Sequence, residues 1–135
     1  MTEVMNFEHA GRTYAGFTPT DALAAGVPQH AIDAALAFAR REKIKAECRS
    51  RIYGIASSEA QINISGAASL VIETPVADRS AEDEALLAAY RQSLAWIKAM
   101  REAVEALTLD ADADITSDAA WPTCPAAVAA LAAQF

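Results

Sequence analysis

The sequence predicts a mainly α-helical protein, with an N-terminal β-hairpin followed by long antiparallel helices and a short C-terminal helix. Three observations support this fold class. Apolar residues recur at three- and four-residue steps over two long stretches, as on one face of a helix. Residues that favour helix caps precede helical stretches, and a proline ends one of them. A short aromatic segment near the N-terminus surrounds a glycine turn, which is typical of a hairpin.

The hairpin is expected in the segment VMNFEHAGRTYAGF, residues 4–17. Phe7 and Tyr14 flank a small turn at Ala10-Gly11, and glycine tolerates the positive φ that such turns often need. An isolated hairpin is marginal in water. We therefore expect it to pack against another element or to pair with another chain.

A short helix should follow the hairpin, capped by Thr20, with Asp21 at its positive end and Gly26 closing it. Pro28 suits the first turn of the next helix. These breaks predict two parts, a hairpin with a short helix at residues 1–27 and a helical domain at residues 28–135.

The helix expected at residues 29–56 carries two apolar stripes that point in different directions. The two halves of this helix should therefore pack against different structures, or the helix should project beyond its own core. The stripes are Ile32, Leu36 and Ala39 in the first half, and Ile44, Cys48, Ile52 and Ile55 in the second.

Residues 57–73 have two interpretations. Alternation at Ile62 and Ile64 suggests a strand, whereas small residues such as Ala67 and Ala68 suggest a closely packed helix. The helical neighbours favour the helix, and Thr74-Pro75 should end the element.

The next helix begins after Ser80, which forms a weaker version of the capping box with Asp83. Its heptad-like pattern suits an antiparallel helical hairpin or a coiled coil. Its main apolar stripe comprises Leu87, Tyr90, Leu94, Ile97, Val104 and Leu107, and Trp96 lies outside this stripe. The segment DADADITSDAAWP should end the helix, and a last short helix is expected at residues 125–135.

Composition limits the possible functions. The chain has 135 residues, enough for one domain, and its apolar fraction of 53% is inflated by alanine, which predicts a thin core or help from self-association. A net charge of −7 argues against general nucleic-acid binding.

Neither a membrane span nor a secretory signal is recognisable, so the cytoplasm is expected. Cys48 and Cys124 form no CxxC; reduced thiols are the simple interpretation, and a disulfide stays open.

No catalytic or cofactor motif is present, so we predict no enzyme activity, cofactor or metal. The acidic run at 110–118 lacks the glycine and the glutamate of an EF-hand loop and is better explained as a solvated loop. His9 and His30 do not have zinc-site spacing. Cys48 lies among basic residues that can lower a thiol pKa, but its place on an apolar stripe favours a packed core residue.

The basic run RREKIKAECRSR, residues 40–51, is best explained as a solvated helix face with internal pairs such as Glu47 with Arg51. Through Arg40 and Arg41 it could instead bind a protein partner or the acidic loop of another copy. The alternative function is a small helical nucleic-acid-binding module that uses this basic helix.

Aromatic residues near the C-terminus are the remaining candidates for a site. Tyr90, Trp96, Trp121 and Pro122 are explained first by structural packing, because Trp121-Pro122 fixes an extended turn that can lay an indole on the preceding helix. A rigid aromatic surface is also typical of recognition sites, so we assign these four residues as candidate partner-binding residues.

Residues 46–131 resemble small proteins encoded in bacteriophage and prophage tail gene clusters. Their C-terminal part is similar to tail-fibre-associated or tail-fibre-assembly proteins, whose ends often read Tyr-Arg-x-x-Leu followed by Trp-Pro-x-x-Pro. The assembly-protein pattern has Arg-Asp-Ile after the leucine, where this chain has Ala95-Trp96-Ile97. The resemblance is carried by the segment CRSRIYGIASSEAQINI and by Tyr90-Arg91, Leu94, Trp96, Met100-Arg101, Ala120-Trp121-Pro122 and Pro125.

This resemblance implies binding or building rather than catalysis. The protein would hold an aggregation-prone tail-fibre protein, or form part of the tail, in the host cytoplasm or in the virion. The long apolar stripes and the thin core agree with surfaces completed by other chains, so a homo-oligomer is also expected.

Overall fold

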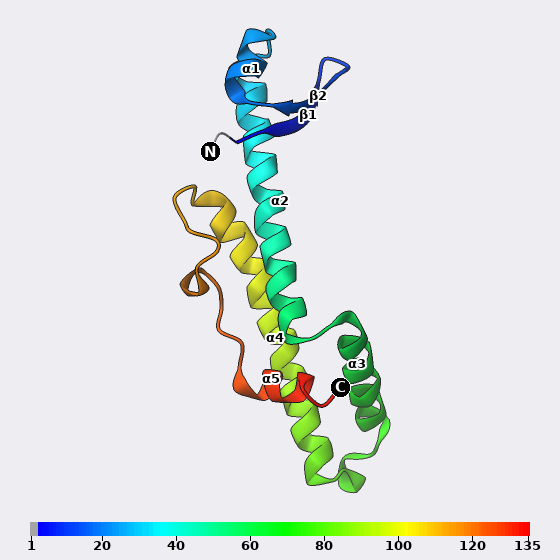
Figure 1. The fold of residues 1–135 in the computed structure, drawn as a ribbon. Helices are drawn as coiled ribbons and strands as arrows, with labels where there is room; N and C mark the ends of the chain where they lie inside the picture. The colour runs from blue at the N-terminus through cyan, green and yellow to red at the C-terminus, as the bar shows by residue number, and fades with distance from the viewer. Residues whose placement is uncertain (1–2) are drawn as a thin grey trace. The chain divides into compact units, whose positions relative to one another are not determined.

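The computed structural model describes residues 3–135, and its mainly helical fold with an N-terminal hairpin confirms the predicted fold class (Figure 1). Short 3₁₀ turns, Val76–Asp78 and Asp118–Ala120, lie in the two longest loops. The elements are β1 (Met5–His9), β2 (Arg12–Phe17), α1 (Pro19–Ala24), α2 (Gln29–Ile55), α3 (Ser58–Glu73), α4 (Ala81–Leu109) and α5 (Ala126–Ala132).

The chain forms two compact units, which we call unit 1, up to Lys45, and unit 2, Ala46–Phe135. The boundary lies within α2, whereas the division predicted from the sequence falls at the start of this helix, after residue 27. Ile32, near the start of α2, packs in the core of unit 1, while Cys48 is buried in unit 2. The two halves of α2 therefore pack in different cores, as the shift in stripe direction predicted, although Ile44 of the second stripe still falls within unit 1.

The hairpin of unit 1 forms around the expected turn. Phe7 pairs with Tyr14 across antiparallel strands, and their rings stack with centroids 5.0 Å apart. Ala10 and Gly11 both have positive φ, at 50° and 75°, which suits the tight turn that matches the twist of two antiparallel strands.

The hairpin packs against helices of its own unit, as its marginal stability alone requires. One core joins β1 and β2 to α1 and the first turn of α2. This arrangement gives unit 1 a closed apolar interior. The buried residues are Met5, Tyr14, Ala22, Val27 and Ile32.

The cap of α1 differs from the prediction. Thr18, not Thr20, is the N-cap: its Oγ1 accepts from the Asp21 amide at 3.1 Å, and the Asp21 carboxylate accepts from the Thr18 amide at 3.3 Å. Pro19 occupies the first helical position, where its missing N–H costs nothing, so Thr20 lies inside the helix. Gly26 closes α1 as predicted, with a φ of 85°.

Residues 58–73 form the helix α3, so the strand interpretation is wrong. Ser57 caps it by accepting from the Ala60 amide at 3.1 Å. Ile62 and Ile64 do alternate between exposed and buried, because two residues on a helix are about 200° apart around its axis. Burial therefore shows the alternation that suggested a strand, although the backbone is helical.

Helix α4 begins at the predicted capping box, in which Ser80 and Asp83 exchange two hydrogen bonds of 3.0 Å. Leu87, Val104 and Leu107 of the predicted stripe are buried, but the buried face departs from the stripe in the middle of the helix. Leu94 is 51% exposed, whereas Trp96 and Met100 are buried. The displacement arises because α4 contacts α3 and α5 and also meets α2, where Cys48 Sγ donates to the Met100 carbonyl.

Helices α3 and α4 run antiparallel, joined by residues 74–80, and α5 packs beside both in unit 2 (Figure 1). Ile64, Ala89 and Leu131 bring the three helices together in one buried cluster. Among residues 3–135, no helix combines the length and apolarity needed to cross a membrane.

Candidate functional site

The segment between α4 and α5, residues 110–125, is held against the helices of unit 2 by two tryptophans. Trp121 is buried, and its indole N–H donates to the Ile115 carbonyl at 2.7 Å. Trp96 on α4 is also buried, and its indole N–H donates to the Pro122 carbonyl at 3.2 Å. Both indoles therefore satisfy their only donor within the chain.

Arg51 on α2 also holds this segment. Its Nε donates to Glu47 and its Nη1 to Asp118, both at 2.8 Å, and its Nη2 donates to the Thr116 carbonyl at 2.9 Å. The guanidinium carbon lies 5.6 Å from the ring centroid of Trp121. Hydrogen bonding to Asp118 raises the pKa of Arg51, so this cation stays charged.

A groove of about 500 Å³ opens beside these residues, in unit 2. Arg51 and Asp118 line it but already pair with each other, while Trp96, Trp121 and Pro122 give it an aromatic and rigid wall. The Cys124 thiol also lines it, donates to the Pro125 carbonyl at 3.6 Å, and has a pKa raised by burial. A thiol whose pKa is raised holds less of the reactive thiolate, so Cys124 is not activated as a nucleophile.

The structure brings together Trp96, Trp121 and Pro122 of the six predicted partner-binding residues. The two indoles are buried, so of these three only Pro122, which is partly exposed, is substantially accessible to a partner. Tyr90 is partly buried and lines a different pocket, and Arg40 and Arg41 belong to unit 1.

The acidic run is exposed, as a solvated loop should be, and its carboxylates shape turns. Asp110 Oδ1 accepts from the Asp112 amide at 3.1 Å. Asp114 Oδ1 accepts from the Thr116 hydroxyl at 2.6 Å and its amide at 3.0 Å, and these bonds lower the pKa of Asp114. In the described part of the chain, no three His, Cys, Asp or Glu residues gather to hold a metal ion.

Cys48 is a packed core residue, as its place on the apolar stripe predicted. Its side chain is 5% exposed, and Sγ donates to the Met100 carbonyl at 3.7 Å. Burial raises the pKa of this thiol and outweighs the nearby charges of Arg101 and Arg49, which lower it.

The two thiols should react at different rates with a thiol reagent in the native protein. Cys124 is partly exposed and should be labelled first. Cys48 should react at least about tenfold more slowly, because only opening of the core exposes its thiolate. Mass spectrometry of peptides after timed labelling measures both rates, and labelling in denaturant gives the unprotected control. Faster labelling of Cys48 would contradict its burial.

The role of Arg51 was only partly visible in the sequence. The pair with Glu47, four residues away, was predicted and is confirmed. The bond to Asp118 spans 67 residues, which no helical period can reveal. The sequence offered only two signals of this contact. One is a cation near the end of a helix, and the other is a Trp-Pro segment preceded by aspartates.

The sequence matches no protein-family model and no curated protein sequence.

Proposed function

We propose that this protein acts by binding other protein chains, without catalysis, through the outward face of α3. The observation that carries the proposal is the exposure of three large apolar side chains on this helix. Ile62, Leu70 and Ile72 are 71%, 68% and 55% exposed. No charged residue lies between Glu59 and Glu73, although the outer face of a surface helix is normally charged or polar.

This face is shaped to receive another helix. Ile62, Gly66 and Leu70 follow one another at four-residue steps, so they lie along one side of α3. Ser65 and Ser69 are small and exposed beside this row. Small residues let a second helix approach closely, while the large ones supply apolar area at roughly 25 cal/mol per Å² removed from water.

The charges at the two ends of the face indicate what kind of partner fits. Glu59 and Glu73 lie on the exposed side of α3, one near each end. A second copy of α3, whether parallel or antiparallel, would bring glutamate beside glutamate. A helix of a different protein, with an apolar stripe and Lys or Arg near both ends, avoids this repulsion.

The biological setting that we propose is the assembly of a bacteriophage or prophage tail. It rests on the resemblance of residues 46–131 to tail-cluster proteins, and it makes a tail or tail-fibre protein the partner. The protein would then work in the bacterial cytoplasm or in the virion. Genes for tail or baseplate proteins beside its own gene would support this setting, and metabolic neighbours would overturn it.

Replacing Ile62 and Leu70 together by Lys should weaken partner binding by roughly 100-fold while leaving the fold intact. We expect each substitution, at the centre of the contact, to cost about 1.4 kcal/mol, which is tenfold in affinity. Because both side chains are exposed, the free energy of unfolding should change by less than about 0.5 kcal/mol. Calorimetric titration measures the affinity, with the product of any tail-fibre gene found beside its own gene as the partner.

Leu109→Lys is the matched control, because Leu109 is 89% exposed but lies at the end of α4. It should bind the fibre protein as the wild type does. If the double variant bound the partner as tightly as the wild type, α3 would not be part of the binding surface. Light scattering at several concentrations tests the other outcome, self-association of the chain.

Nucleic-acid binding through residues 40–51 remains the second candidate. Duplex affinity depends on cations that are available to phosphates. Several cations of this segment pair with carboxylates of the same chain, which lowers the local positive potential. These ion pairs are Lys43 with Glu3 at 2.8 Å, Lys45 with Glu42 at 2.9 Å, and Arg51 with Glu47 at 2.8 Å. A band shift with DNA or RNA at low salt would favour this alternative.

A further inference from the structure

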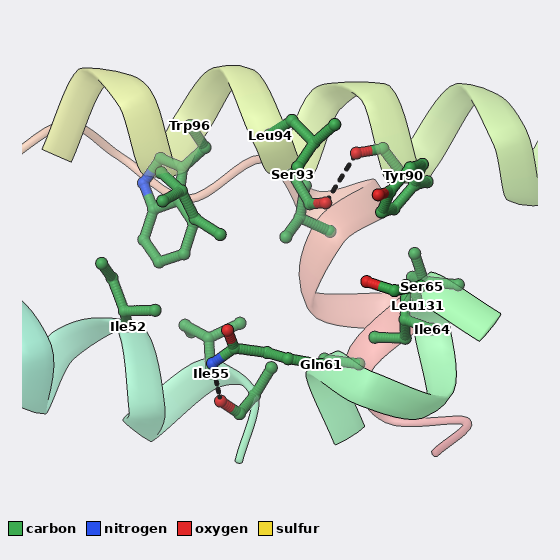
Figure 2. A pocket seen from close by; sticks show the side chains of 14 residues that line it. Ile52, Ile55, Gln61, Ile64, Ser65, Tyr90, Ser93, Leu94, Trp96 and Leu131 are labelled. Carbon is green, nitrogen blue, oxygen red and sulfur yellow. Dashed lines mark hydrogen bonds between the residues drawn. The ribbon is translucent and has the colours of Figure 1, made fainter. Parts of the chain in front are cut away.

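A second pocket of unit 2 lies where the end of α2 meets α3, α4 and α5 (Figure 2). Trp96 and Ile52 face each other across one part of it, and Ile64, Tyr90 and Leu131 surround the other. The space amounts to about 100 Å³. Ser65 borders both this pocket and the outward face of α3, but Ile62 and Leu70 of that face do not line the pocket.

The pocket follows from the alanine-rich sequence. Four helical segments converge there, but Ala56 and Ala132 contribute only methyl groups to the lining. Side chains of that size leave the gap between converging helices unfilled. An unfilled apolar space lacks dispersion contacts on its lining, so a ligand that fills it gains those contacts.

The lining is apolar and carries no charge: none of the 14 residues around the pocket is Asp, Glu, Lys, Arg or His. Its polar groups are few. Gln61 Nε2 donates to the Ala56 carbonyl at 2.9 Å, which leaves the side-chain oxygen of Gln61 directed into the pocket (Figure 2). The Ser93 hydroxyl donates to the Tyr90 carbonyl at 2.6 Å.

We propose that this pocket binds a small uncharged molecule with an apolar body of about one benzene ring and one hydroxyl group that donates to Gln61. An apolar cavity of roughly 150 Å³ holds benzene. This pocket has about 100 Å³ and is partly open, so we expect the ring to enter it and to extend through the open side. A charged group placed among these uncharged residues would lack a partner, so a charged ligand is disfavoured. The hydroxyl gives the Gln61 oxygen a hydrogen bond.

The indole N–H signals of the two tryptophans provide the test. Trp96 lines the pocket and Trp121 does not, so a proton–nitrogen correlation spectrum contains both a reporter and a control. Titration with p-cresol should shift the Trp96 signal saturably, with a Kd on the order of 0.1–1 mM for so small a ligand, and leave Trp121 in place. Toluene should bind several-fold more weakly, and benzoate should not bind.

Two serine variants on α3 locate the site. Ser65 is exposed and lines the pocket, so Ser65→Leu should obstruct it and weaken p-cresol binding at least tenfold. Ser69→Leu makes the same change one turn further along, away from the pocket, and should leave the affinity within twofold. Circular dichroism checks that both variants keep the fold.

Several results would overturn the proposal. One is the lack of any saturable Trp96 shift at about 10 mM p-cresol, well above the expected Kd. Equal movement of both indole signals would indicate non-specific contact, and unchanged affinity in Ser65→Leu would place the ligand elsewhere. The Ile62 and Leu70 variants should bind p-cresol with the affinity of the wild type. Failure of the pocket proposal and failure of the proposed protein contact can therefore be told apart.

Discussion

Trp121→Ala should lower the free energy of unfolding by about 3–5 kcal/mol, the range for removal of a buried aromatic side chain. The indole is only 6% exposed and lies beneath the Arg51 guanidinium. Its removal leaves a cavity, breaks the 2.7 Å bond to the Ile115 carbonyl and takes away a surface on which the 110–125 segment rests. Urea denaturation followed by far-UV circular dichroism measures the loss.

Trp121→Phe separates the packing from the hydrogen bond. Phenylalanine keeps an apolar ring but cannot donate to the Ile115 carbonyl, so a smaller loss of about 1–3 kcal/mol is expected. Tyr53→Ala is the control, since Tyr53 is an aromatic residue of α2 that is 52% exposed, and it should cost less than about 1 kcal/mol. If Trp121→Ala were as mild as this control, the segment would not belong to the core.

Ile32→Ala should destabilise unit 1 by about 2–5 kcal/mol. Ile32 is fully buried, with Met5, Tyr14 and Val27 in the same core. A core this small contributes little stability. The cavity left by the substitution should therefore let the hairpin separate from the helices and lose its strand pairing. Hydrogen exchange of the amides in β1 and β2 measures the effect directly, because their protection depends on the strand pairing.

Phe38→Ala is the matched control for unit 1. Phe38 lies on the same helix and is larger than Ile32, but it is 63% exposed. Its removal should leave hairpin protection unchanged within about 0.5 kcal/mol. Normal protection in Ile32→Ala would show that the hairpin is stable without α2, contrary to the packing of unit 1.

Local features were predictable because their causes lie within a few residues. The turn at Ala10-Gly11 and the Ser80 cap followed from backbone preferences and side-chain hydrogen bonds. The cap of α1 was assigned to Thr20, although the sequence held the better signal. Pro19 favours the first position of a helix, and this points to Thr18 as the cap.

The buried face of α4 was harder to predict, because a period identifies a stripe but not its neighbours. Leu94 fits the period and is half exposed, whereas Trp96 is buried and donates its indole N–H to the Pro122 carbonyl. Alanines added to the difficulty. Ala89 is 8% exposed and part of the core, but its single methyl group carries almost no signal in an alanine-rich helix.

The candidate site depends on contacts between distant segments, which explains why only its members and not its geometry were predicted. Trp96, Trp121 and Pro122 were identified as aromatic and rigid residues, and they do converge. That convergence depends on the bond from Trp96 to the Pro122 carbonyl and on Arg51, whose bonds to Asp118 and to the Thr116 carbonyl have no local signature. The apolar face of α3 was not identified, because the strand alternative left the orientation of its residues open.

The place of α5 in unit 2 has a consequence for protein synthesis. Leu131 and Ala132 complete the interior that α3 and α4 begin, so that interior cannot close until the ribosome has added them. At about 5–20 residues per second, several seconds or more separate Lys45 from this point. Unit 1 can therefore fold while the chain is still being synthesised. The apolar sides of α3 and α4 stay exposed to solvent until α5 has been made, so chaperones or rapid completion of the chain would protect them.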